Sequence, residues 1–166
     1  MSVSICFMKT NKTPRLMSNG IADPTKAFGQ CLWQSKLYAK KHNQGLIRVV
    51  GAEYGKREHW AIYTDIGQDG DERFLYSYGL SGTIIDLTSR QFDETLPARY
   101  EDEASEWMDN ACLWLGDNLN YELYLTSDSQ VEPISWGYWE LDNEEIRLPK
   151  KMMGQWNISV LGSLTY

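Results

Sequence analysis

The segment 29–41 constrains the fold most strongly, because it joins a loop to a helix at a cysteine. Residues 31–41 contain neither glycine nor proline, and Lys40 and Lys41 lie where the helix dipole favours positive charge. Gly45 follows, and glycine suits a left-handed helix cap. The sequence therefore predicts a helix over 31–41 that begins at Cys31 and is capped by Gly45.

Much of the remaining chain consists of short alternating segments that are typical of β-strands. Strands are predicted at 46–50, 59–66, 73–78, 83–88 and 121–126, with weaker candidates at 3–8 and 156–161. A glycine-rich turn at 67–71 makes 59–78 a hairpin. Apolar residues at helical spacing predict an amphipathic helix over 101–115, which Gly116 caps. After Pro133 the pattern becomes irregular.

This order of elements predicts an α+β fold. The first helix packs on an antiparallel sheet, and the second, amphipathic helix is inserted between strands. A chain of 166 residues fits one domain with a single core. We expect one domain over 1–166, with its core at about 25–125 and an aromatic-rich C-terminal extension at about 126–166.

The acidic charge of the chain argues against several classes of partner. The formal net charge is −7 and the sequence pI is about 4.8, whereas nucleic acids and anionic membrane surfaces need clustered basic residues. No stretch of about 18 apolar residues is present, so no membrane span is expected. Residues 1–8 lack the basic region of a signal peptide. We expect synthesis in the cytoplasm. A protein that is secreted by a leaderless route would have the same sequence features.

The three cysteines differ in their sequence context. Their odd number and wide spacing predict neither a disulfide framework nor a metal site, and indicate a reducing compartment. Cys112 lies on the apolar stripe of the second helix and is expected in the core, and Cys6 is expected to be structural. Cys31 is the candidate nucleophile, because a helix N-terminus lowers the pKa of a thiol. The alternative for Cys31 is an ordinary buried apolar cysteine.

A thiol nucleophile needs an imidazole base and an acceptor that orients this base. His59 begins a predicted strand and is preferred to His42, which follows two lysines at a helix end. Asp86 follows two isoleucines, and pairing with His59 would offset the cost of burying its carboxylate. The alternative role of Asp86 is to cap the next turn. Asp65 is disfavoured, because six residues along a strand place it about 20 Å from His59.

Donors for an oxyanion are expected near the thiol. The backbone N–H of Cys31 is one candidate, and the side chains of Gln30, Trp33 and Trp60 are others. The two histidines lie far apart, without an HExxH motif or paired CxxC motifs, so no metal site is expected. The sequence also lacks a glycine motif for phosphate, and we expect no cofactor.

At these residues the chain resembles the papain-like superfamily in its transglutaminase and NlpC/P60 forms. Gly29–Cys31 with Trp33 is similar to the transglutaminase nucleophile segment, although there the tryptophan directly follows the cysteine. His59–Ala61 and Ile85–Thr88 are similar to the segments that carry the histidine and the acidic residue. The stretch Ile85–Phe92 is also similar to one in papain-fold bacterial toxin domains. The resemblance covers about residues 25–95.

The resemblance implies thioester chemistry on an amide. Cys31 would attack the carbonyl carbon, His59 would protonate the leaving amine, and Asp86 would orient His59. This chemistry covers cysteine peptidases, peptidoglycan amidases and protein glutamine deamidases, and transglutamination when an amine replaces water. The substrate would be a protein, a peptide or peptidoglycan, and small leaderless proteins of this type are often effector toxins.

The alternative function is a non-catalytic acidic binding module. Such a module would be an inactive papain-like relative, an inhibitor or an immunity protein, and it would bind a basic partner. The net charge of −7 and the aromatic stretch 136–139 favour this alternative.

Overall fold

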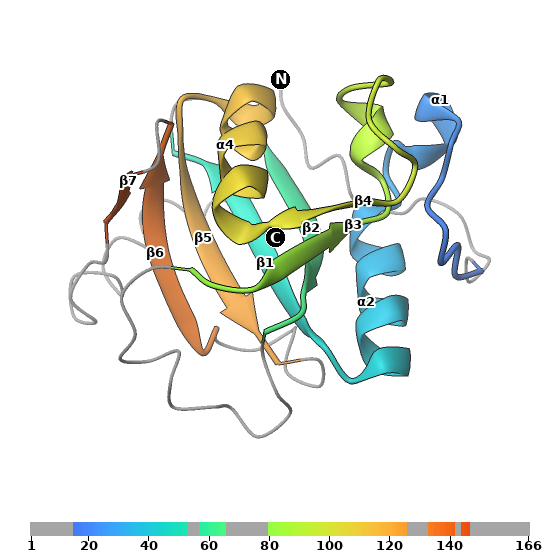
Figure 1. Cartoon of the computed structure of the whole chain (residues 1–166), viewed down its shortest axis with the longest axis horizontal. Coiled ribbons are helices and arrows are strands. Elements are labelled where there is room, and N and C mark those ends of the chain that lie inside the picture. Colours follow the sequence, from blue (N-terminus) through green and yellow to red (C-terminus); the bar gives the residue numbers. More distant parts are fainter. Residues whose placement is uncertain (1–14, 53–56, 66–79, 126–132, 142–143, 147–166) are drawn as a thin grey trace.

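The computed structural model describes residues 15–52, 57–65, 80–125, 133–141 and 144–146 (Figure 1). The strands predicted at 3–8, 73–78 and 156–161 lie outside these residues, as does Cys6.

An antiparallel sheet of seven strands forms the centre of the described structure, in the order β4-β3-β2-β1-β5-β6-β7 (Figure 1). Its strands are β1 (Gly45–Gly51), β2 (Glu58–Tyr63), β3 (Thr83–Asp86), β4 (Tyr100–Glu103), β5 (Asn118–Tyr124), β6 (Ser135–Glu140) and β7 (Glu144–Ile146). Two longer helices are α2 (Cys31–His42) and α4 (Ala104–Leu115). The short elements are α1 (Pro24–Ala27) and the 3-10 helix η1 (Ser89–Gln91). The predicted α+β class is therefore confirmed.

The pairing register determines which side chains share a face of the sheet. In β1 and β2, Arg48 lies opposite Trp60, while Val49 lies opposite His59. Because successive strand residues point to opposite faces, Trp60 and His59 lie on different faces of the sheet. We call the face that carries Trp60 the α2 face and the face that carries His59 the α4 face, after the helix that covers each (Figure 1).

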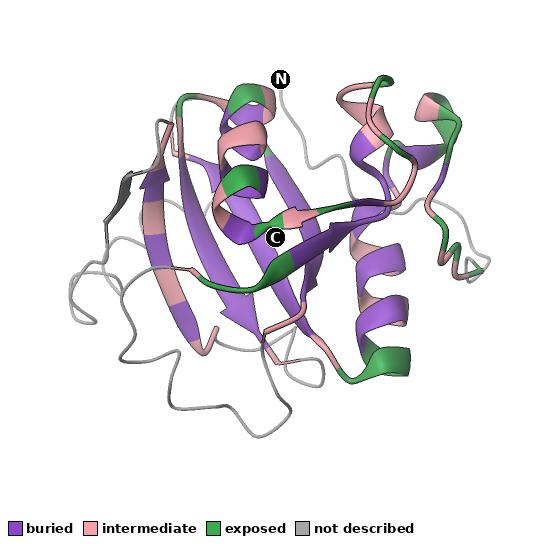
Figure 2. Ribbon diagram, in the orientation of Figure 1, coloured by how far each residue is buried: buried purple, intermediate pink, exposed green. Residues whose placement is uncertain are grey.

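The larger core fills the α4 face of the sheet. The inner side of α4 is buried, as Figure 2 shows, while its outer side stays exposed. Side chains of α4 at spacings of three and four residues meet side chains of β1, β2 and β5; they include Trp107, Met108, Ala111, Ile47, Val49, Ala61, Leu119, Tyr121 and Leu123. Burial of each large apolar side chain stabilises the fold by about 1.5–3 kcal/mol.

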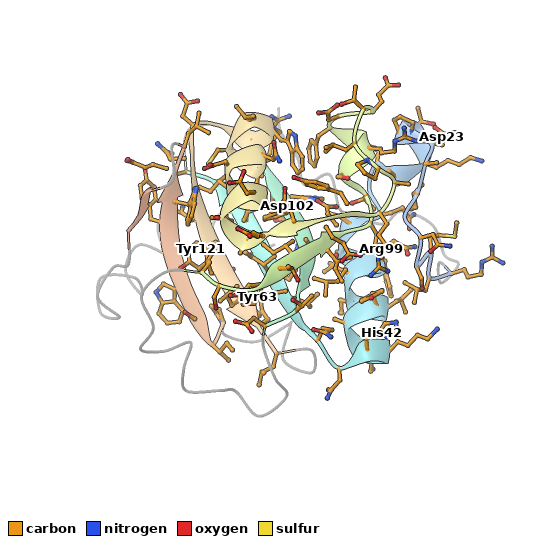
Figure 3. The ribbon with its side chains drawn as sticks, viewed as in Figure 1. Asp23, His42, Tyr63, Arg99, Asp102 and Tyr121 are labelled. Atoms are coloured by element: carbon orange, nitrogen blue, oxygen red, sulfur yellow. The ribbon has the colours of Figure 1, made fainter. Side chains whose placement is uncertain are left out.

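Two smaller clusters fill the α2 face. One contains Cys31, Ala39, Leu46, Trp60 and Tyr124, and the other contains Tyr38, Ile62, Ile85 and Leu87. Arg99 ties α2 to the segment that enters β4 (Figure 3). Its guanidinium donates to the Tyr38 hydroxyl at 3.1 Å and to the Ser18 carbonyl oxygen at 2.9 Å.

Of the two predicted ends of α2, only the N-terminal one is confirmed. The helix α2 begins at Cys31, as expected, and extends to His42. The expectation that Gly45 caps it is wrong, because Asn43 adopts the left-handed conformation (φ 59°) and Gly45 already belongs to β1. Asparagine tolerates this conformation better than most residues do, since its short side chain bonds locally.

Two further segments differ from the prediction. Residues 101–103 form part of the edge strand β4, so the second helix begins three residues later than expected. There the ladder between Ile84 and Asp102 replaces the first helical turn. Residues 135–140, which were expected to be irregular, form β6 and extend the sheet beside β5. Within β6, a side chain at Gly137 would clash with the Tyr121 ring, since a Cβ atom there would lie 2.6 Å from Oη.

Candidate functional site

Cys31 lies at the first position of α2, on the α2 face of the sheet. Its side chain is fully buried and belongs to the cluster that contains Trp60 and Tyr124. Its sulfur takes part in a disulfide bond. The odd number and wide spacing of the cysteines did not predict this bond, because bridging depends on the separation of the Cα atoms in the fold and not on sequence spacing.

The predicted oxyanion donors have mixed environments. Gln30 is the N-cap residue of α2 and is half-buried, as is Trp33. Trp60 lies on the same face as Cys31, but its indole N–H donates to the Glu58 carboxylate at 2.9 Å. The indole N–H of Trp60 is therefore already hydrogen-bonded to a buried carboxylate and does not point to an oxyanion.

His59 and Asp86 meet on the α4 face of the sheet. His59 Nε2 lies 2.8 Å from Asp86 Oδ2, and both side chains are fully buried. The expectation that these two residues pair is therefore confirmed as a contact. The carboxylate also accepts from Trp107 Nε1 at 3.0 Å and from the Thr88 backbone N–H at 3.0 Å. His59 can donate to this carboxylate only in a form that carries a hydrogen on Nε2.

Aromatic rings enclose the imidazole of His59. The Trp107 ring lies nearly parallel to it at a centroid distance of 6.0 Å, and the Phe92 ring meets it edge-on at 4.9 Å. Trp114 stacks on Phe92 at 4.8 Å and also meets the imidazole edge-on. Among the described residues, His59 Nδ1 is buried without a hydrogen-bond partner. The carboxylate thus orients an imidazole whose second nitrogen faces an apolar wall.

The structure does not bring Cys31 to His59, which corrects the expectation that the N-terminus of the first helix faces the imidazole. Cys31 packs with Trp60 on the α2 face, whereas His59 packs with Trp107 on the α4 face. The backbone of the sheet separates them, because neighbouring residues of β2 point in opposite directions. Of the three predicted site residues, only His59 and Asp86 share a site.

Sequence reasoning missed a buried ionic network beside Cys31. Arg48 donates to Glu58 at 2.7 Å and approaches Glu122 at 3.5 Å, and the Tyr124 hydroxyl donates to Glu122 at 2.6 Å. Burial lowers the pKa of Arg48, but the two carboxylates outweigh this effect and raise it. Burial and Glu122 raise the pKa of Tyr124. The sequence signal for this network was a single arginine or glutamate in each of three strands that are otherwise largely apolar.

The remaining candidates have structural surroundings. His42 is exposed at the end of α2 (Figure 3), and its ring contacts the Tyr38 ring in a tilted arrangement at a centroid distance of 4.2 Å. Asp65 accepts from the Ser81 hydroxyl at 2.6 Å and takes no part in the His59 site. Cys112 lies in the core as expected, and its burial raises the pKa of the thiol to about 12.

Acidic residues are concentrated in one segment of the chain, 93–117. It contains eight acidic residues and one arginine, so its formal charge of −7 equals that of the whole chain. Within it, the exposed acidic residues are Glu94, Glu101, Glu103, Glu106 and Asp117. The exposed lysines Lys26, Lys40 and Lys41 belong to α1 and α2. Exposed negative charge therefore gathers on β4, α4 and the segments that adjoin them, where Arg99 pairs with Glu101 and the exposed Arg57 donates to the Trp114 carbonyl oxygen.

The described residues hold no group of three or more histidine, cysteine or acidic side chains arranged to bind a metal ion. Across the same parts of the chain, no helix is both long and apolar enough to cross a membrane. Comparison of the chain with protein-family models, with curated proteins and with solved structures found no match.

Proposed function

We propose that this chain is a non-catalytic binding domain for a basic protein partner. The observation that carries the proposal is the concentration of the entire formal net charge in the segment 93–117, much of which is exposed on β4 and α4. Such a one-sided distribution steers oppositely charged partners and fixes their orientation on binding.

The surroundings of Cys31 and of the pair His59 and Asp86 support this proposal. The Cys31 sulfur is held in a disulfide bond within an apolar cluster, and His59 is fully buried on the other face of the sheet. Asp86 accepts from three buried donors and so ties β3 to β2 and α4. In a binding domain these groups stabilise the fold, and the exposed charge performs the function.

Binding of a synthetic basic peptide tests the proposal. We expect a fluorescein-labelled helical peptide of lysine and leucine to bind saturably, with an affinity that falls as sodium chloride is added. A peptide in which glutamate replaces every lysine is the control and should not bind. Fluorescence anisotropy measures both. The proposal fails if neither peptide binds, or if both bind equally well.

A second candidate function is a papain-like thiol hydrolase or glutamine deamidase, with Cys31 as nucleophile, His59 as base and Asp86 as its orienting acceptor. The 2.8 Å contact from His59 to Asp86 favours it, since this contact leaves Nδ1 available as a base. The activity requires release of Cys31 from its disulfide bond and a rearrangement that brings it to His59. A peptide or protein substrate, and delivery as a secreted effector, belong to this candidate.

Reduction of the protein separates the two candidates. For a hydrolase, reduced protein releases ammonia or cleaves a glutamine-containing peptide, and Cys31→Ala and His59→Ala each abolish the reaction. For a binding domain, the reduced wild type and both variants are equally inactive. Iodoacetamide labelling followed by peptide mass spectrometry checks that Cys31 was in fact reduced.

A further inference from the structure

The outer side of α4 continues the acidic surface of β4 along one line. Glu106, Asn110 and Leu113 recur at spacings of three and four residues and so share one face of α4, and Glu103 is the N-cap residue that precedes this face. Glu103 and Glu106 are exposed, and no hydrogen bond or ion pair of their side chains is described. Figure 2 shows that this side of α4 faces away from the sheet. We call these four residues, together with Trp114, the α4 surface.

An apolar group lies at the C-terminal end of the α4 surface. The Leu113 side chain is 67% exposed, one of three large hydrophobic side chains exposed in the described parts of the chain. Next to it, Trp114 is half-buried and stacks on the half-buried Phe92, with 8° between the ring planes. Aromatic residues are enriched at protein interfaces, and here an exposed leucine adjoins a half-exposed aromatic pair at one end of a charged helix face.

The aromatic pair also packs against the imidazole of His59, which carries one of several buried polar atoms without a partner in the described parts of the chain. Phe92 and Trp114 both meet the His59 ring edge-on, at centroid distances of 4.9 and 6.0 Å. His59 Nδ1 is buried, without a hydrogen-bond partner among the described residues. Buried polar atoms in this state are rare in proteins. The apolar end of the α4 surface therefore adjoins a buried imidazole that has one nitrogen without a described partner.

We infer that the α4 surface is the docking site of the basic partner, with Leu113 as its apolar anchor. The inference rests on the proposed function, and it names the surface and the partner chemistry. The partner presents lysine or arginine side chains to Glu103 and Glu106, and an apolar pocket or side chain to Leu113 and Trp114. Charge on the helix sets the orientation of the partner and the salt dependence of binding. Leu113 and Trp114 supply affinity, because the partner buries them on binding.

Two charge-matched double variants and one leucine variant locate the site. Glu103→Lys with Glu106→Lys changes the charge of the α4 surface. Glu94→Lys with Asp117→Lys makes the same change at exposed positions outside it. Leu113→Ala removes the anchor. None of these residues contributes a side chain to the described core clusters, so all variants should fold.

We expect the lysine–leucine peptide to bind the first double variant and Leu113→Ala at least about tenfold more weakly than the wild type. The control double variant should stay within about twofold to threefold of the wild type, since it keeps the anchor and the nearest carboxylates. In amide NMR spectra of the wild type, shifts on peptide addition should concentrate at residues 103–114. Far-UV circular dichroism confirms that each variant is folded.

Failure of the inference is distinguishable from failure of the proposed function. If the wild type binds the peptide but the control variant loses as much affinity as the α4 variant, the docking site lies elsewhere and the binding function stands. Shifts that map away from α4 overturn the inference in the same way. If the chain self-associates through α4 and Lys40→Glu with Lys41→Glu abolishes this in sedimentation, a second copy and not a basic partner occupies the surface. If the wild type binds no basic peptide, both proposals fail.

Discussion

Replacement of Asp86 by alanine tests the structural role assigned to the His59 site. The carboxylate accepts hydrogen bonds from His59 Nε2 at 2.8 Å, from Trp107 Nε1 at 3.0 Å and from the Thr88 backbone N–H at 3.0 Å. All three residues are at least 99% buried, so water does not readily replace the lost acceptor. Alanine therefore leaves three buried donors without partners.

The magnitude follows from the number of donors. A buried donor left without a partner costs about 1–3 kcal/mol, which gives roughly 3–9 kcal/mol for three. Removal of the carboxylate also removes the cost of burying its charge, which moves the expected loss toward the lower end. We expect Asp86→Ala to lower the free energy of unfolding by about 4 kcal/mol. Trp107→Phe removes one donor, leaves the carboxylate with two, and should cost about 2 kcal/mol.

Urea unfolding followed by tryptophan fluorescence and by circular dichroism measures these losses. Asp65→Ala is the control, because Asp65 follows β2, the strand that carries His59, but is half-buried and accepts from one exposed serine hydroxyl. It should cost less than about 1 kcal/mol. If Asp86→Ala unfolds the protein completely, Trp107→Phe still provides the measurement. The reasoning is refuted if Asp86→Ala and Asp65→Ala lower stability equally, or if Trp107→Phe costs nothing.

Three further predictions concern other parts of the fold. Arg48→Met leaves Glu58 and Glu122 buried without a counter-charge and should cost about 3–5 kcal/mol in urea unfolding, and adding Glu58→Gln and Glu122→Gln should restore most of it. A loss below about 1 kcal/mol in Arg48→Met, or no recovery in the triple variant, contradicts the account. Asn43→Ala should lower the free energy of unfolding by about 1 kcal/mol and Asn43→Gly should not, because φ at this position is 59°. Thermal unfolding that ranks the two variants the other way refutes Asn43 as the left-handed cap of α2. Hydrogen bonds from the Thr25 hydroxyl and backbone hold the pKa of Asp23 below its usual value, so Thr25→Val should raise that pKa in a carbon-13 NMR titration. The stabilisation that Asp23 provides is present above the unfolded-state pKa and is lost as the pH falls through the folded-state pKa, and an unchanged pKa in the variant would count against the capping bond.

The helices and most of the described strands were predictable, because their signals are local. The stretch from Cys31 without helix breakers and the apolar spacing from Ala104 to Leu115 fixed two helices within a few residues. The acidic run before Ala104 misled the prediction, since the same carboxylates suit a helix N-terminus and an exposed edge strand. Only pairing with β3 distinguishes the two cases.

The candidate site was predictable as a pair but not as a triad. An aspartate in an apolar strand needs a donor, and both roles considered for Asp86 are found, the contact with His59 and the capping bond from the Thr88 backbone N–H. Whether the side chain of His59 or that of Trp60 faces α2 depends on the strand register, and a shift of one residue exchanges them. No local pattern in the sequence fixes that register.

By itself, the sequence determined the α+β class and the start of α2 at Cys31, and it favoured the pairing of His59 with Asp86. These features depend on backbone preferences, helical periodicity and the cost of an unpaired buried charge, all of which act over short distances or through residue type. Tertiary structure alone decided that Cys31 and His59 lie on opposite faces of the sheet and that the acidic carboxylates line β4 and α4. The reason is that the register of a strand pair and the face that a helix covers are set by packing between segments far apart in the chain.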